Sequence, residues 1–334
     1  MQLMNVFYYP ISILKEVKLL FNSIIVFSKL CKGHGLKVMS KYVLRRLLYS
    51  IQKGLMNQRH IIRKVHDYEM VLDLNDLGLS RVLTFFGTRE LDHKLILERE
   101  LKEGMTVLDL GANIGYYAIM ESKLIGNSGF IYALEPHPSN VQLLKTNIQL
   151  NKINERIEVH QKGGSNENGV ESLCISAESN LHSFLKDKNS SDETVDVPMV
   201  TISDFRQGRR KIDFIRMDIE GYEVEVFEGL LPALDDAEFR PSILFETHRS
   251  KYTEGHTIKQ SLKLMFEKGY KAKIIASNEG RDAKFTEHGY KAEVLFPTDG
   301  MVRGLYYGVS NEDAIKFICD IGGVRAVYLE YSNG

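Results

Sequence analysis

The stretch VLDLGANIG, Val107 to Gly115, decides the fold of this chain. A short apolar run, Val107 to Leu110, is followed by a glycine-rich turn, and a helical pattern over residues 114–125 begins inside that turn. Glycines at such a turn let the backbone approach a ligand closely, and the first amide groups of the helix can donate hydrogen bonds to it. The spacing is GxxxG, not the GxGxxG of dinucleotide-binding loops. The turn alone therefore indicates a ligand without identifying it.

Strands and helices alternate on the C-terminal side of this turn. The apolar patterns predict strands at 107–110, 130–134, 157–160, 213–217, 242–246, 271–276 and 305–309, with helices at 114–125, 138–151, 222–231 and 257–268. A βαβαβ order predicts a doubly wound parallel sheet whose ligands bind beyond the carboxyl ends of the strands. We therefore expect an α/β fold with a Rossmann-like, seven-stranded, mostly parallel sheet. Residues 163–194, rich in Ser, Asn, Glu and Gly, are expected to form a loop or hairpin over the ligand face.

The N-terminal part of the chain differs in charge from the rest. Residues 1–64 hold 12 Lys and Arg against the single acid Glu16, a balance of about +11, whereas the net charge of the whole chain is -1. The apolar run from Val17 to Leu30 is interrupted by Lys18 and Lys29, and is too short for a membrane span of about 20 residues. We expect a basic helical extension over residues 1–66, a catalytic domain over 67–334, and a cytoplasmic location. The extension could cap the core or contact an anionic membrane through residues 1–64; nucleic acid is the less favoured partner.

The acid at the end of the second predicted strand narrows the choice of ligand. Glu135 follows the glycine turn by about 20 residues, where a carboxylate can accept hydrogen bonds from ribose hydroxyls. A dinucleotide would use the same acid. However, the turn lacks the third spaced glycine that makes room for a pyrophosphate, while Asp109 and Asn113 suit a cationic amino-acid group. This combination favours S-adenosylmethionine as the cofactor.

Acidic side chains also follow the fourth and fifth predicted strands. Asp218 falls at the end of one strand, Glu220 follows it, and Glu246 and His248 end the next strand. Methyl transfer is an in-line displacement, so the protein must align the two reactants and remove one proton. A histidine whose pKa is near neutrality can accept that proton. We expect Asp218, Glu220 and His248 to form the catalytic group, with no metal required.

Four ordered motifs, DLGANIGYYAI, ALEPHPSN, KIDFIRMDIEGYEVEVFEG and ILFETH, resemble those of the FkbM-type class I S-adenosylmethionine-dependent methyltransferases. The segment FFGTRELDH resembles the short glutamate-containing segment that precedes the glycine loop in that family. The resemblance covers roughly residues 79–252 and implies O-methylation of sugar or polyketide-type hydroxyls. The residues that it assigns to the cofactor are Gly111, Asn113 and Gly115 at the methionine part, Glu135 at the ribose, and Pro136 and His137 beside the adenosine. The motif DIEGYE places Asp218, Glu220 and Glu223 at the junction of cofactor and acceptor. Where the family often has a small residue and an acid, the chain has Lys162-Gly163-Gly164-Ser165.

The sequence thus predicts an S-adenosylmethionine-dependent O-methyltransferase acting on a hydroxyl of a carbohydrate, glycolipid or related small molecule. One alternative is a metal-assisted O-methyltransferase in which Asp218 and Glu246 bind magnesium. Others are an RNA methyltransferase that uses the basic extension, and a partner subunit that binds a nucleoside without turnover. Specificity for the acceptor would reside in residues 163–200, 249–256 and 277–303, which carry no readable motif.

Overall fold

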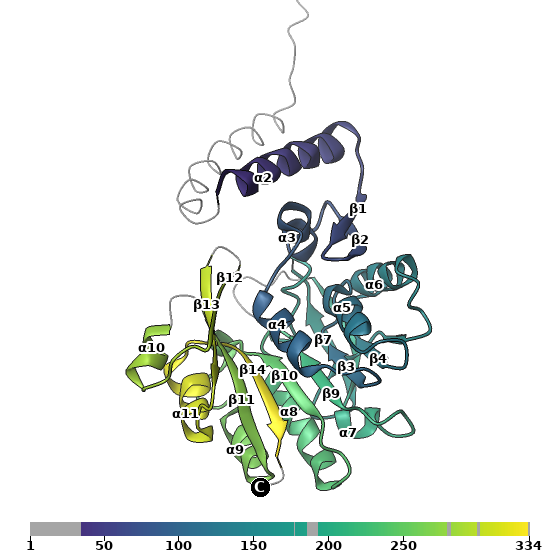
Figure 1. Cartoon of the computed structure of the whole chain (residues 1–334). Helices are drawn as coiled ribbons and strands as arrows, with labels where there is room; N and C mark the ends of the chain where they lie inside the picture. Colours follow the sequence, from purple (N-terminus) through teal and green to yellow (C-terminus); the bar gives the residue numbers. More distant parts are fainter. Residues whose placement is uncertain (1–34, 177, 186–192, 279–281, 299–300, 333–334) are drawn as a thin grey trace, which may run out of the picture.

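The computed structural model describes residues 35–176, 178–185, 193–278, 282–298 and 301–332, and the chain folds as an α/β protein around one large sheet (Figure 1). The sheet has nine strands in the order β12-β13-β11-β14-β10-β9-β3-β4-β5. Their bounds are β3 Thr106–Leu110, β4 Phe130–Leu134, β5 Ile157–His160, β9 Phe214–Met217, β10 Ser242–Glu246, β11 Tyr270–Ser277, β12 Val294–Thr298, β13 Met301–Tyr307 and β14 Val324–Tyr331. β5, β4, β3, β9 and β10 are parallel neighbours, while β14 and β13 run against the other strands.

Helices cover both faces of the sheet, as expected for a doubly wound fold (Figure 1). Successive side chains of a strand point to opposite faces, so Phe214 packs into one core and its neighbour Ile215 into the other. The first core also contains residues of α4 Leu91–Glu100, α5 Tyr116–Leu124 and α6 Pro138–Leu150. The second contains residues of α7 Ile202–Phe205, α8 Glu223–Leu230, α9 Lys259–Glu267 and α11 Asn311–Ile315.

The doubly wound, mostly parallel sheet is confirmed, but it has nine strands instead of seven. The predicted strands at 271–276 and 305–309 correspond to β11 and β13. The strand next to β10, however, is β14, whose Leu329, Tyr328, Val327 and Ala326 pair with Ile243 to Glu246. Sequence order could not give this arrangement, because the last strand of the chain inserts between two earlier ones. β12 pairs with β13 and extends the sheet further.

The polar segment 163–194 forms part of a second, three-stranded sheet, β6-β8-β7, as the predicted hairpin insertion. Its strands are β6 Gly163–Gly164, β7 Gly169–Cys174 and β8 Thr194–Val200. Residues 178–185 lie between β7 and β8 and contact the glycine turn, since the Asn113 Nδ2 amide donates to the Ser179 carbonyl over 2.9 Å. The insertion therefore covers the ligand face.

The N-terminal described residues form a helix and a hairpin. α2 Gly35–Ser50 continues into η1 Ile51–Leu55, followed by β1 His60–Val65, β2 Tyr68–Asp73 and α3 Leu79–Phe86. β1 pairs with β2 across the expected boundary at 66/67, and Ile61 and Val65 are buried in the core, so residues 60–65 pack with the main domain. Most of the predicted basic extension, residues 1–34, lies outside the described residues. Within the described part, no helix is long and apolar enough to cross a membrane.

The remaining short elements connect the main ones without entering the large sheet. They are η2 Leu231–Asp235, η3 Arg249–Lys251, α10 Asp282–Glu287 and η4 Lys316–Ile321.

Candidate functional site

The glycine turn brings two strand ends into direct backbone contact. Gly111 has φ 80°, and a Cβ atom placed on it would lie 2.1 Å from the carbonyl oxygen of Asp218. Only glycine leaves this space, because a side chain would be both strained at that φ and in collision with the backbone. The ends of β3 and β9 therefore meet at Gly111, where the order of the parallel strands reverses and α/β sheets bind their ligands.

Gly115 packs the helix after the turn against its neighbour. It caps α5 with φ 94°, and a Cβ atom there would lie 2.8 Å from Leu144 of α6. Gly115 thus permits close packing of α5 against α6, and it is not among the residues that line the cleft. Its predicted contact with the methionine part of the cofactor stays a prediction.

A cleft runs along the carboxyl ends of β3, β4 and β9. Its walls contain the predicted cofactor residues Gly111, Asn113, Glu135, Pro136 and Asp218. Lys162, Gly163 and Gly164, where the chain departs from the family pattern, also line it, and so does Glu220. Ser179, Asn180, His182 and Phe184 of the insertion close the opposite side. Sequence positions more than a hundred residues apart thus share one cavity.

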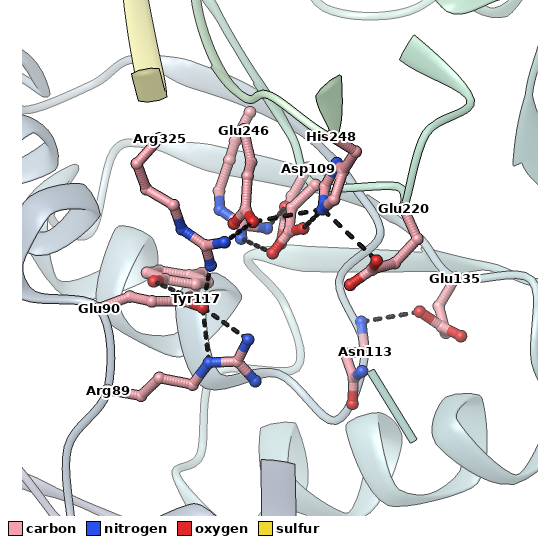
Figure 2. Close-up of polar contacts among 12 residues, drawn as sticks. Arg89, Glu90, Asp109, Asn113, Tyr117, Glu135, Glu220, Glu246, His248 and Arg325 are labelled. Carbon is pink, nitrogen blue, oxygen red and sulfur yellow. Dashed lines mark hydrogen bonds and ion pairs between the residues drawn. The ribbon is translucent and has the colours of Figure 1, made fainter. Parts of the chain in front are cut away.

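Glu135 is held in place by three hydrogen bonds. Its carboxylate accepts from the Asn113 backbone amide at 2.8 Å (Figure 2). It also accepts from the His137 amide at 3.0 Å and the Asn140 Nδ2 amide at 3.1 Å. Burial raises the pKa of Glu135 to about 7, although these donors favour the charged form. A carboxylate offers about four acceptor positions, so one remains for a ribose hydroxyl. The geometry of Glu135 therefore fits its predicted role.

His137 faces away from this cleft. Its ring stacks on that of His182 with centroids 4.1 Å apart, and both rings line a neighbouring cavity together with Asp76 and Asn140. Only the backbone amide of His137 reaches the site, through Glu135. Of the two residues predicted beside the adenosine, Pro136 lines the cleft and His137 does not, and their contact with the cofactor stays a prediction.

A buried ion pair links the two central strands beneath the cleft. Arg216 lies opposite Asp109 in the register of β3 and β9 and donates to it at 2.9 Å, and also to Asp218 at 3.0 Å. Burial raises the pKa of Asp109, and Arg216 opposes that rise. Burial also acts to raise the pKa of Asp218, but Arg216 together with His248 and His93 outweighs it, so that this pKa is lowered. Asp109 is completely buried and does not line this cleft, so it acts on the site through Arg216.

His248 lies at the centre of a group of carboxylates, as its position at the edge of β10 predicted. Its Nδ1 atom lies 2.8 Å from Glu223, and its Nε2 atom lies 3.9 Å from Asp218. The Nε2 atom also lies 3.2 Å from Glu246 and 3.5 Å from Glu220 (Figure 2). The structure therefore brings the three predicted catalytic residues together. Burial alone would lower the pKa of His248, but Glu223 and Glu246 outweigh it and raise that pKa well above its usual value. A ring that is already protonated cannot accept a proton from an acceptor hydroxyl.

Glu220 is better suited to that task. Burial raises its pKa to about 8; His248 opposes the rise, and Asp218 and Glu246 add to it. Its backbone has φ 52°, a conformation that non-glycine residues rarely adopt and that is often found at functional sites. The Ser183 hydroxyl donates to its carbonyl oxygen at 3.0 Å, which links it to the insertion. Among the three predicted catalytic residues, Glu220 combines access to the cleft with a pKa in the range of a general base.

Further residues complete the site, and the sequence indicated only some of them. Glu223 was placed near the acceptor by resemblance, but its oxygens are taken by His248, the Gly221 amide and the Tyr252 hydroxyl, so it positions the imidazole. Arg325 of β14 contacts both Glu246 and Glu90, and the Arg89 guanidinium also contacts Glu90 (Figure 2). No sequence signal pointed to Arg325. Glu90 was indicated only by the segment FFGTRELDH.

Glu90 and Arg89 line a second cavity that adjoins the cleft. The two cavities share Gly111, Asn113, Asn180 and Asp218 in their walls. The Tyr117 hydroxyl donates to Glu90 at 2.9 Å. Burial opposes ionisation of Glu90, but Arg89 and Arg325 outweigh it and hold its pKa well below its usual value. This second cavity therefore presents fixed charges of both signs beside Asp218.

Asp218, Glu246 and His248 are also the side chains best placed to hold a metal ion. Their ligand atoms lie within 4.8 Å of one another. Arg216 and Arg325 already supply positive charge to the two carboxylates, and the raised pKa of His248 means that a metal would compete with a proton. The negative charges of Asp218 and Glu246 are thus balanced by the guanidinium groups of the two arginines and by the imidazolium of His248.

Residues 109–272 match the Methyltransferase FkbM domain. Shorter segments resemble protein-L-isoaspartate O-methyltransferases. The enzyme of Methanothrix thermoacetophila is 38% identical over 50 residues, 15% of this chain and 24% of the relative, and that of Fervidobacterium nodosum is 46% identical over 55 residues, 16% of this chain and 28% of the relative. The chain thus spans only about a quarter of the length of these relatives.

Solved structures of methyltransferases also align with parts of this chain. A methyltransferase FkbM from Methylobacillus flagellatus KT has a TM-score of 0.36 and 16% identity, covering 62% of this chain and 44% of that chain. An S-adenosylmethionine-dependent O-methyltransferase from Thermotoga maritima has a TM-score of 0.39 and 12% identity, covering 83% of this chain and 87% of that chain. Similarity at this level does not extend to function. Through residues 109–272, which hold the glycine turn, Glu135 and the Asp218–Glu223 segment, this chain belongs to the proteins with an FkbM-type methyltransferase domain.

Proposed function

We propose that the chain is an S-adenosylmethionine-dependent O-methyltransferase whose acceptor is a hydroxyl of a carbohydrate, glycolipid or related small molecule. The observation that carries the proposal is that one cleft is lined both by Gly111 and Glu135, which suit a nucleoside, and by Glu220, which suits proton removal. S-adenosylmethionine supplies a methyl group on a sulfonium centre. The protein must hold it, orient the acceptor and take one proton.

The residues that would hold the cofactor are divided between the two ends of the cleft. Glu135 would accept hydrogen bonds from the ribose, with Pro136 beside the adenosine. Gly111 and Asn113 would contact the amino-acid part, where the glycine turn lets the backbone approach. Asp218, whose carboxylate is kept charged by Arg216, would face the positive sulfonium.

Glu220 would accept the proton of the acceptor hydroxyl. The charged ring of His248, fixed by Glu223, lies 3.5 Å from the Glu220 carboxylate and stabilises its ionised form. His248 then acts as a positioning residue, because it lines neither cavity and reaches the cleft through Glu220. The carboxylates around the cleft are acceptors for hydroxyl groups, which supports a polyhydroxylated acceptor.

The test has two stages. Isothermal titration calorimetry with the intact chain should detect binding of S-adenosylmethionine, and complete absence of binding would end the proposal. Cell extracts incubated with the chain and a methyl-labelled donor should then yield a labelled hydroxylated molecule, identified by mass spectrometry. Label in protein carboxyl groups would instead indicate an activity like that of the isoaspartate relatives. Label in RNA would indicate an RNA methyltransferase, and binding without any labelled product would indicate a partner subunit.

Metal assistance is tested separately. Since the counter-charges of the carboxylates are already provided by Arg216, Arg325 and His248, we expect labelling to be unchanged after treatment with a chelator. A loss of labelling that added magnesium restores would favour the metal-assisted alternative, with Asp218 and Glu246 as ligands.

A further inference from the structure

Helix α2 presents an apolar face to solvent. Its side chains Val43, Leu44, Leu47 and Leu48 are all exposed, with Leu44 at 57% and Leu47 at 52%. Their spacing of three and four residues places them on one side of the helix. Leu55, at the end of η1, and the adjacent Met56 extend the same exposed set. We call these six residues the leucine face. A soluble protein seldom leaves such a contiguous apolar surface without a partner.

The opposite side of α2 is polar and is the side that packs against the protein. Arg46 and Tyr49 are buried, the Tyr49 hydroxyl donates to the Leu74 carbonyl at 3.0 Å, and the Tyr49 ring packs edge-on against Phe85 at 5.1 Å. Arg45 donates to the Phe85 carbonyl at 2.9 Å. These contacts fix the rotation of the helix about its axis. The leucine face is therefore turned outward by specific interactions on the other side.

The leucine face lies in a basic part of the chain. Residues 35–66 contain no Asp or Glu, and Lys53, Arg59, Arg63 and Lys64 follow the helix in addition to Arg45 and Arg46 on its packed side. Arg59 and Lys64 are exposed beyond the end of η1. Apolar side chains flanked by cations suit the interface of an anionic bilayer, where the chains enter the acyl region and the cations meet the headgroups. A neutral protein partner would gain nothing from this charge.

We propose that the leucine face, with its basic flank, docks this protein on an anionic phospholipid bilayer. Figure 1 shows α2 beyond α3, at the outer end of the molecule. α3 contacts α2 through Phe85, and its first residue, Leu79, lines the second cavity together with Arg89 and Asp218. An eight-residue helix is about 12 Å long, so docking holds the catalytic cleft close to the lipid surface. The inference goes beyond the proposed methyl transfer and does not depend on the acceptor.

Flotation of the full chain with vesicles tests the docking directly. Vesicles of phosphatidylglycerol and phosphatidylcholine should carry the protein, vesicles of phosphatidylcholine alone should carry little, and high salt should weaken the binding. The variant Leu44→Gln/Leu47→Gln should bind the anionic vesicles roughly tenfold or more weakly, because it removes two inserting side chains. Its thermal melting should stay close to that of the unaltered chain, since both residues are solvent-exposed.

The matched control is Val170→Gln/Leu295→Gln, which changes two apolar residues of 64% and 62% exposure on β7 and β12. This control should bind vesicles like the unaltered chain, and both variants should keep their affinity for S-adenosylmethionine. Failure of the unaltered chain to float, or equal binding to neutral vesicles, overturns the proposal. So does unchanged binding of the Leu44/Leu47 variant, which would assign the binding to another segment such as residues 1–34. A dimer that dissociates in this variant, seen by light scattering, would show that a second copy covers the face.

Discussion

Replacing Gly111 by alanine tests the contact between the ends of β3 and β9. The added Cβ would lie 2.1 Å from the Asp218 carbonyl oxygen, whereas real contacts of this kind are not shorter than 3.0 Å, so the Asp218 backbone must move by about 0.9 Å. The φ of 80° adds a strain of about 1–2 kcal/mol. The movement also disturbs the hydrogen bond of 3.1 Å that the Asp218 backbone amide donates to the Leu110 carbonyl, and the Asp218–Arg216 ion pair. These losses add roughly 1–3 kcal/mol.

Gly208→Ala separates these two effects. Gly208 has φ 69°, and no atom lies within 4 Å of the position of its Cβ, so this variant carries the backbone strain alone. We expect Gly208→Ala to lower the melting temperature by roughly 2–4 °C per kcal/mol of strain and to bind S-adenosylmethionine normally. Gly111→Ala should melt lower still and bind the cofactor at least about tenfold more weakly, as 1.4 kcal/mol corresponds to a factor of ten.

Calorimetric titration and thermal melting of both variants provide the assay. The reasoning is refuted if Gly111→Ala binds S-adenosylmethionine as tightly as the unaltered chain, or if the two variants are indistinguishable. In either case, the close approach of Asp218 would have no bearing on the cofactor.

Three further predictions concern other parts of the site. Burial raises the pKa of Glu220 to about 8, and only the ionised form accepts a proton, so labelling should increase with pH through about 8 and level off above it. Glu220→Gln should reduce labelling roughly 10²–10⁴-fold with unchanged cofactor affinity, and a pH-independent rate in the unaltered chain would contradict this role. Arg216→Met leaves Asp109 buried without its counter-charge and should lower the free energy of unfolding, measured with denaturant, by about 3–5 kcal/mol. The double variant Asp109→Asn/Arg216→Met should lose less stability, and equal losses in the two variants would argue against a stabilising ion pair. Gly78→Ala places a Cβ 2.2 Å from the Asn180 side chain and should speed dissociation of S-adenosylmethionine in stopped-flow measurements. The control is Gly169→Ala, whose Cβ meets no atom within 4 Å. Identical dissociation rates in the two variants would show that residues 178–185 do not retain the cofactor.

The short-range features of this protein follow from its sequence. The apolar run before Gly111 is a buried strand because strands lie on both sides of it and helices cover both its faces, and the turn after it needs glycine at a positive φ. Glu135 was found from its distance along the chain, since a helix and a second parallel strand occupy the roughly 20 residues after the turn and place the end of the second strand beside that of the first. The Asp218–Glu223 and Glu246–His248 segments were found because they end neighbouring strands. Local periodicity was sufficient for each of these predictions.

Contacts between distant parts of the chain could be decided only by the tertiary structure. Arg325 meets Glu90 across 235 positions because β14 inserts beside β10, and no local pattern encodes that strand order. The same packing turns His137 away from the cleft, commits Gly115 to the contact with Leu144 and surrounds His248 with carboxylates that raise its pKa. The sequence by itself thus determined which residues stand at the carboxyl edge of the sheet. Burial and charge pairing across the fold decided their protonation, and so favoured Glu220 over His248 as the base.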